Sequence, residues 1–273
     1  MAFPTASLDI TRSGMKCQLC DTEAPLIESH VIPRPFFVGT GASPNSGKIL
    51  SSVVGIHPKR SPVGPYDGGI LCASCDGRIG VWDEVGVRLL HRELHSFELH
   101  ASDGAALALT KESYDYSKLK LFFLSVLWRS GVSSLPMFGR VSLGPHQARL
   151  RSMLLRNEPG RSSDYSVALG VYTERGQLAA LGIGMMDPFR ERFDGILTYR
   201  YYLGRVTALI KVDARPFLAP LSEVCMDPSR PLVLVARDLQ SSPELKAVGK
   251  VISAPQNARA FRRSEDRSNS RDV

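Results

Sequence analysis

Long apolar runs are missing from the sequence, and their absence excludes one broad class of protein. No stretch of about 18 or more apolar residues occurs in the 273 residues, so we expect no membrane-spanning segment. The segment from Met1 to Lys16 has neither the apolar core nor the cleavage-like site of a secretory signal, which predicts a cytoplasmic protein. Internal repeats are also absent.

Cysteine is scarce, but four of the five cysteines follow a regular pattern. Cys17 and Cys20 form one CxxC pair, Cys72 and Cys75 form a second, and Cys225 stands alone. Structural disulfides are rare in cytosolic proteins, so two such pairs predict one tetrahedral Zn²⁺ site with four thiolate ligands. A closed site of this kind has no open coordination position, so we expect the zinc to be structural. Cys225 is expected to be a small buried apolar side chain.

Acidic residues are fewer than basic ones, which gives a formal net charge of +7. A basic surplus is compatible with a polyanionic partner such as nucleic acid. The alternative is a basic surface that only aids solubility, because part of the surplus lies in a C-terminal tail. This tail, at residues 256–273, contains several arginines among Ser, Asn and Asp, and its low hydrophobicity predicts disorder.

The rest of the chain divides by composition into three segments. We expect a flexible leader at 1–14, a zinc-binding module at 15–100 and a C-terminal α+β domain at 112–255. Residues 39–69 are rich in glycine and proline and cannot form a long helix or a central strand, so they predict a long loop with one short strand at 49–54.

Hydrophobic spacing predicts a helix directly after the second CxxC pair. Apolar side chains recur there at steps of three and four residues and would lie on one helical face, namely those of Ile79, Trp82, Val85 and Leu89. A metal-supported ribbon followed by a helix is therefore expected for the zinc-binding module.

Helices and then strands are expected in the C-terminal domain. A helix at 114–129 would have Asp115 as its N-cap, Gly131 at its end and a buried stripe with Phe122, Phe123 and Trp128, and a second helix would span 145–156. β-Branched and aromatic runs predict strands at 165–173, 177–183, 195–202, 206–212 and 232–236, a hairpin turn at 203–205 and a last helix at 243–252. The fold class is therefore α+β, with the zinc-binding module followed by a helical segment and a mainly antiparallel sheet.

The segment between the two CxxC pairs suggests a chemistry. The stretch Glu28-Ser29-His30-Val31-Ile32-Pro33 follows the first pair, and Ile70-Leu71 leads directly into the second. This order resembles the HNH (ββα-metal) endonucleases with embedded zinc knuckles. In that family a stretch like DHIxP supplies the general base, and a stretch like NLxxLCxxC(H/N) supplies an orienting residue and a metal ligand. The resemblance covers roughly residues 15–90, about a third of the chain.

The resemblance implies that His30 is the general base, that Asp67 lies near the orienting Asn, and that Asp76 takes the place of a catalytic metal ligand. A neutral imidazole can accept a proton from water near pH 7, and carboxylates bind Mg²⁺ or another divalent cation. Glu28 would face the same side of its strand as His30, and Asp83 could supply a further oxygen ligand. The implied function is a metal-dependent endonuclease, with DNA as the expected nucleic acid.

Several residues also allow a plainer interpretation. Ser29 stands where the family has a carboxylate or His, which favours a catalytically degenerate module that binds nucleic acid or protein without cleavage. Asp76 is equally compatible with a helix cap, Asp83 with a solvated helix residue, and His30 with a structural role. A third alternative is a zinc-stapled interaction protein that binds no nucleic acid. The C-terminal domain carries no motif that indicates a chemistry.

Overall fold

The computed structural model describes residues 15–37, 48–50, 59–60, 63–172 and 183–238, with a few positions between 242 and 253. The expectations for the leader and the tail therefore lie outside the described residues, as do most of the strand at 177–183 and of the helix at 243–252. The described part is a mixed α+β fold with three α-helices, a seven-stranded sheet and two smaller sheets, which confirms the predicted fold class at this level. None of the described helices is both long and apolar enough to cross a membrane.

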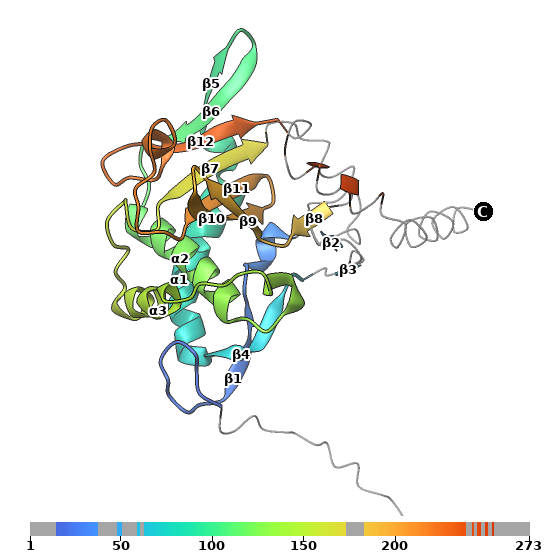
Figure 1. Ribbon diagram of the computed structural model, residues 1–273, viewed down its shortest axis with the longest axis vertical. Helices are drawn as coiled ribbons and strands as arrows, with labels where there is room; N and C mark the ends of the chain where they lie inside the picture. Colours follow the sequence, from blue (N-terminus) through green and yellow to red (C-terminus); the bar gives the residue numbers. More distant parts are fainter. Residues whose placement is uncertain are drawn as a thin grey trace, which may run out of the picture.

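A two-stranded antiparallel ribbon followed directly by a helix forms the centre of the zinc-binding module (Figure 1). β1 (Leu26–His30) pairs with β4 (Tyr66–Cys72), and α1 (Ala73–Val87) begins at the next residue. The helical face predicted after the second CxxC pair is confirmed. Its side chains are buried, three within α1 and the fourth in the π-helical turn η2 (Arg88–Arg92) that continues it: Ile79, Trp82, Val85 and Leu89.

The large sheet has the strand order β5-β6-β12-β7-β11-β10-β9, and only its β12–β7 pair is parallel. The mainly antiparallel sheet expected from the sequence is therefore present. β12 is the last of the described strands in sequence, yet it lies inside the sheet between β6 and β7. The bounds are β5 (Glu98–Ser102), β6 (Ala105–Lys111), β7 (Val167–Tyr172), β9 (Phe189–Phe193), β10 (Ile196–Leu203), β11 (Val206–Lys211) and β12 (Leu232–Arg237).

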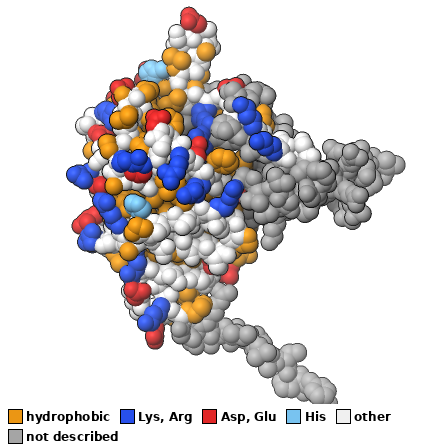
Figure 2. All heavy atoms as spheres, in the orientation of Figure 1, with side chains coloured by type: hydrophobic (Ala, Val, Ile, Leu, Met, Phe, Trp, Pro, Cys, Tyr) orange, Lys and Arg blue, Asp and Glu red, His pale blue; other side chains and the backbone are white. Residues whose placement is uncertain are grey.

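The β5–β6 hairpin was not expected from the sequence. It turns at Asp103 and Gly104, which both have positive φ (51° and 77°), and such an Asp-Gly turn matches the twist of two antiparallel strands. The boundary expected at residue 100 falls inside β5. Figure 1 shows the hairpin projecting from the body, and apolar side chains line it in Figure 2, with Leu99 and Leu107 exposed.

A small sheet connects the segment between β1 and β4 with the C-terminal part of the chain. β2 (Lys48–Leu50) pairs with β3 (Lys59–Arg60) in antiparallel and with β8 (Ile183–Met186) in parallel orientation. The short strand expected at 49–54 is therefore present at its first residues, while 51–58 lie outside the described part.

Two helices cover the middle of the molecule beside α1. α2 (Tyr116–Val132) begins as predicted, because the Asp115 carboxylate accepts a hydrogen bond from the backbone N–H of Lys118 at 3.0 Å. The prediction that Gly131 ends this helix is wrong. The helix runs through Gly131, where a Cβ atom would overlap Leu143, so the glycine serves close packing.

α3 (His146–Arg156) agrees with the predicted helix and ends at Asn157, which adopts the left-handed conformation. Short helical turns complete the fold: η1 (Arg34–Phe36), η3 (Leu94–Ser96), η4 (Pro136–Phe138) and η5 (Leu221–Val224).

One continuous core joins the zinc-binding module to the C-terminal part. Phe122, Phe123 and Trp128 are fully buried, as predicted. Gly86 of α1 lies so close to the ring of Phe122 that a Cβ atom there would come within 2.6 Å of it. In Figure 1, α1, α2 and α3 lie together between the β1–β4 ribbon and the large sheet. The helices therefore hold the ribbon against the rest of the protein.

Candidate metal centre and active site

The four cysteines of the two CxxC pairs converge at one end of the β1–β4 ribbon. Their sulfur atoms all lie within 4.8 Å of one another, and the Sγ atoms of Cys20 and Cys72 are 3.9 Å apart. A tetrahedral Zn²⁺ with bonds of about 2.3 Å requires sulfurs roughly 3.8 Å apart. All four are free thiols, so the group Cys17, Cys20, Cys72 and Cys75 fits a structural Zn²⁺.

The backbone of each pair presents its two sulfurs to the same point. The backbone N–H of Cys17 donates to the Thr22 carbonyl at 3.0 Å, and that of Asp21 donates to the Cys17 carbonyl at 2.9 Å, which closes the first pair into a tight loop. Cys72 is the last residue of β4 and Cys75 lies in the first turn of α1. The N–H of Cys72 donates to the sulfur of Cys17 at 3.4 Å and so links the two pairs.

The thiols differ in how readily they lose a proton. The Thr22 hydroxyl lowers the pKa of Cys20 to about 6, against burial, which raises it. Burial, together with the neighbouring cysteines, raises the pKa of Cys75 far above its ordinary value. Four thiolates this close together are stable only when a cation balances their negative charge. Zn²⁺ provides that positive charge.

A side chain of α3 holds the first cysteine loop from outside. Arg151 forms an ion pair with Asp21 at 2.6 Å and donates to the backbone carbonyl of Gln18 at 3.0 Å. Arg151 and Asp21 are 130 residues apart in the sequence, so no local sequence pattern predicts their contact. Cys225 lies outside the four-cysteine group, and it is not fully buried, which differs from the prediction. It is half-buried, it pairs with Ala168 through a single β-bridge, and its thiol donates to the Leu221 carbonyl at 3.2 Å.

His30 closes β1 and is fixed by its ring and by its backbone. Its Nε2 atom lies 2.9 Å from the carbonyl oxygen of Val63. The rings of His30 and Tyr66 pack edge to face, with their centroids 6.1 Å apart. A carbonyl oxygen only accepts hydrogen bonds, so Nε2 must carry the proton. In the neutral ring the lone pair then lies on Nδ1, to which the described residues form no hydrogen bond.

Arg129 of α2 joins the end of β1 to α1, and the sequence did not single it out. Its Nη1 donates to the His30 carbonyl at 2.6 Å and to Asp83 at 2.9 Å, while Nη2 donates to the other Asp83 oxygen at 2.6 Å. Ser125 accepts from the same guanidinium through its carbonyl and its hydroxyl. Arg129 is 1% exposed, so a buried cation organises this corner of the fold.

Asp83 is an ion-pair partner rather than a solvated side chain, because only 17% of its side chain is exposed. Burial raises the pKa of Asp83, and the attraction of Arg129 lowers it. The charges of Asp76 and His30 also act on the Asp83 carboxyl, so the three groups share one electrostatic environment.

Asp76 does not cap α1, because the N-cap is Cys72. Its half-buried carboxylate lies in the first turn, where the helix dipole favours negative charge, and the described residues form no hydrogen bond with it. Asp76 is therefore a half-buried carboxylate with unused acceptor capacity in the first turn of α1.

Asp67 is buried, and its carboxylate accepts hydrogen bonds from β4 and from the loop after α2. Its Oδ1 accepts from the Gly69 N–H, and its Oδ2 accepts from the hydroxyls of Ser133 and Ser134 and from the Ser134 N–H, at 2.9–3.2 Å. Burial raises the pKa of Asp67, but these four hydrogen bonds outweigh it and lower the pKa below the ordinary value. Asp67 thus anchors the loop after α2 to β4, and an orienting role toward His30 stays a prediction.

Glu28 and Ser29 lie at an irregular point of the ribbon. The register shifts between Ile27 and Ser29, so simple alternation does not place Glu28, which is exposed. Ser29 is 1% exposed and its hydroxyl has no hydrogen-bond partner among the described residues.

The described residues contain one group of three or more His, Cys, Asp or Glu side chains whose ligand atoms lie close enough to share a metal ion. That group is the four cysteines. The second metal site, with Glu28, Asp76 and Asp83, stays a prediction.

No protein-family model, no curated protein and no solved structure matches this chain. The resemblance to the HNH endonucleases therefore depends on the motif residues and on the order ribbon, zinc cysteines and helix.

Proposed function

We propose that this protein is a metal-dependent endonuclease that hydrolyses phosphodiester bonds in nucleic acid, with Nδ1 of His30 as the general base. The observation that carries the proposal is the hydrogen bond from Nε2 of His30 to the Val63 carbonyl. It fixes the tautomer that a base needs and leaves Nδ1 with a free lone pair.

The surroundings of His30 suit proton transfer. The backbone carbonyl of His30 is held by Arg129, so the residue is fixed at both ends. In the proposed step, Nδ1 takes a proton from the attacking water. Asp76 would hold a divalent cation, which would supply positive charge for the phosphate in the transition state. This scheme gives the C-terminal part a role, because Arg129 belongs to α2.

A second function is binding of nucleic acid without cleavage. It is favoured by the contacts of the other carboxylates, since Arg129 occupies both oxygens of Asp83 and four donors occupy those of Asp67. Ser29 also stands where the HNH family has a carboxylate or His. In this case basic side chains of the protein, whose net charge is +7, would contact the phosphate backbone.

One set of assays separates the two functions. Supercoiled plasmid is incubated with the protein and Mg²⁺, Mn²⁺ or Ni²⁺, and nicking is followed by gel electrophoresis. His30→Ala is expected to lower the nicking rate at least about 100-fold. His95→Ala is the matched control, because His95 is exposed and its ring also bonds a backbone carbonyl, that of Arg92.

Wild-type protein that shifts the plasmid in a salt-sensitive way but never nicks it supports the binding function instead. If it neither nicks nor shifts DNA or RNA at low salt, both proposals fail and the zinc-stapled interaction protein is the remaining alternative.

A further inference from the structure

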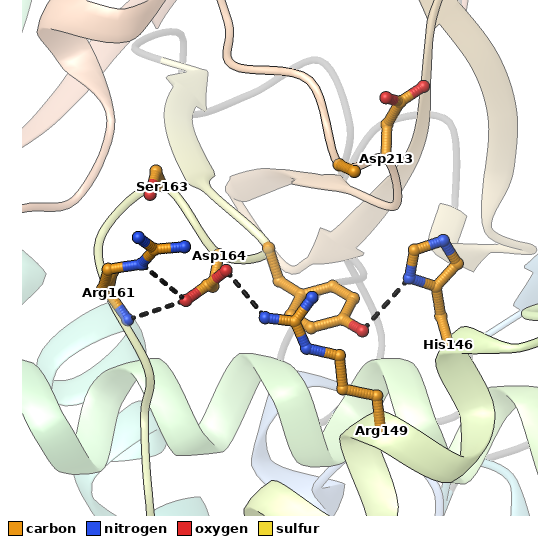
Figure 3. A pocket seen from close by; sticks show the side chains of 8 residues that line it. His146, Arg149, Arg161, Ser163, Asp164 and Asp213 are labelled. Atoms are coloured by element: carbon orange, nitrogen blue, oxygen red, sulfur yellow. Dashed lines mark hydrogen bonds and ion pairs between the residues drawn. The ribbon is translucent and has the colours of Figure 1, made fainter.

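A second polar site lies in the C-terminal part, away from His30 and the zinc cysteines. A cavity of about 130 Å³ opens between the start of α3, the loop before β7 and the residues after β11 (Figure 3). Its walls include His146, Arg149, Arg161, Asp164 and Tyr165. The cavity is too small for a folded partner, but it has room for a phosphate group with part of a sugar.

We propose that this cavity binds the phosphate group of a phosphomonoester, carried either by a free nucleotide or by the 5′ end of a nucleic acid strand. The proposal does not depend on phosphodiester cleavage at His30, because the two sites share no residue.

The two arginines are arranged by a single carboxylate. Oδ1 of Asp164 accepts from Arg149 at 2.8 Å, and Oδ2 accepts from the backbone N–H of Arg161 at 3.1 Å and from its Nε at 3.4 Å. Each guanidinium carries five N–H donors, and the pairing with Asp164 uses one from each side chain. The remaining donors lie beside the cavity in planar forks, the geometry that matches phosphate oxygens.

Tyr165 lines the cavity together with these arginines and His146, and its backbone has a strained conformation. Its φ is 48°, a left-handed conformation that is unfavourable for an aromatic residue. Tyr165 is 3% exposed, and its hydroxyl oxygen lies 3.1 Å from Nδ1 of His146. The Cζ atom of Arg149 lies over the Tyr165 ring, 5.5 Å from its centroid. Such a conformation persists only where the surrounding structure fixes it. Here it places the Tyr165 ring against the Arg149 guanidinium.

The side chains that line the cavity carry more positive than unpaired negative charge. Of the two carboxylates there, Asp213 is already paired with Arg215 at 2.7 Å. Asp164 is shared between Arg149 and Arg161, so one carboxylate faces two guanidinium groups. The remaining positive charge favours an anion such as a phosphate group.

The test is a set of calorimetric titrations in buffer without added divalent cation. The probes are inorganic phosphate, adenosine 5′-monophosphate, and one oligonucleotide with either a 5′-phosphate or a 5′-hydroxyl. Arg149→Ala is expected to weaken binding of the phosphorylated probes at least 10-fold. Arg156→Ala is the matched control, because Arg156 lies on the same helix, is exposed and pairs with Glu158 outside the cavity.

Ser163→Glu provides a variant that spares the fold. Ser163 is exposed and lines the cavity, so the new carboxylate repels an anion without disturbing the core. Loss of binding in Ser163→Glu with unchanged thermal unfolding supports the site. A preference for the free nucleotide over the phosphorylated oligonucleotide identifies a nucleotide site, and the reverse identifies a strand-end site. The proposal is overturned if no phosphorylated probe binds at millimolar concentration, or if Arg149→Ala and Ser163→Glu bind the phosphorylated probes like wild type.

Discussion

Arg129 and Asp83 form a bidentate ion pair in which the same guanidinium nitrogen also holds the backbone carbonyl of His30. One side chain of α2 thereby positions the end of β1 and the middle of α1. The geometry around the candidate base is consequently a property of the whole fold and not of the zinc-binding module alone.

Arg129→Met should be strongly destabilising, because it leaves the Asp83 carboxylate and the His30 carbonyl without their donor. Removal of one partner of a buried pair typically costs about 3–5 kcal/mol. The double variant Arg129→Met/Asp83→Leu should recover a large part of that loss, because no charge is then left unpaired. Urea denaturation measures both. A change below about 0.5 kcal/mol in Arg129→Met would show that the pair contributes nothing to stability.

Cys17→Ser should remove the zinc and lower the Tm by about 10 °C or more, because binding of a structural Zn²⁺ is itself folding free energy. Cys225→Ser should keep the full metal content, since Cys225 lies outside the four-cysteine group. Metal analysis and thermal unfolding test both variants. Folded wild-type protein without zinc contradicts the assignment.

His30→Ala should lower the rate of cleavage by at least about 100-fold, the lower end of what a general base contributes. Zinc content and Tm should stay close to wild type, because the four thiolates and Arg129 hold the ribbon. Added imidazole should restore part of the rate by replacing the missing base. If His30→Ala unfolds the protein instead, His30 has a structural role.

Asp67→Asn should cost roughly 1.5–3 kcal/mol at neutral pH, because an amide cannot accept from all four donors that the carboxylate satisfies. The wild-type contribution is present above pH 3.8, the ordinary pKa, and is lost as the pH falls toward the lowered folded pKa. Asp67→Asn should therefore show a flatter loss of stability in acid. Denaturation curves between pH 2 and 7 decide the matter, and parallel pH profiles would exclude this role.

Lys120→Met should stabilise the protein at pH 7, on the order of 4 kcal/mol. Burial lowers the pKa of Lys120 to about 7, so the unfolded chain binds a proton that the folded chain lacks between about pH 7 and 10.5. Wild-type stability should rise with pH across that window, and the rise should be smaller in Lys120→Met. The charges of Cys225, Asp164 and Lys211 also act on the pKa of Lys120. A variant less stable than wild type at pH 7 would show that Lys120 has a compensating partner.

Local signals predicted much of the fold. The CxxC pairs, the cap at Asp115 and the apolar face of α1 each depend on residues a few positions apart, so sequence spacing is enough. The Asp103-Gly104 turn was equally local and could have revealed the β5–β6 hairpin. Gly131 misled the prediction because a glycine that ends a helix and one that admits a neighbouring Leu side chain look alike in a sequence.

The candidate site was less accessible to sequence reasoning. Arg129 lies 46 residues from Asp83 and 99 from His30, and it occurs within an apolar helical stripe that indicates only core. The serines that hold Asp67 lie just beyond the end of the same helix. Such partners are chosen by packing between elements, for which no spacing rule exists.

The position of β12 has a consequence for biosynthesis. This strand fills the gap between β6 and β7, although it leaves the ribosome last among the strands of the large sheet. Until Leu232–Arg237 has been made, β6 and β7 each present an open edge, and open edges pair readily with other chains. Nascent chains that stall upstream of β12 are therefore prone to aggregate, and its arrival closes both edges in one step.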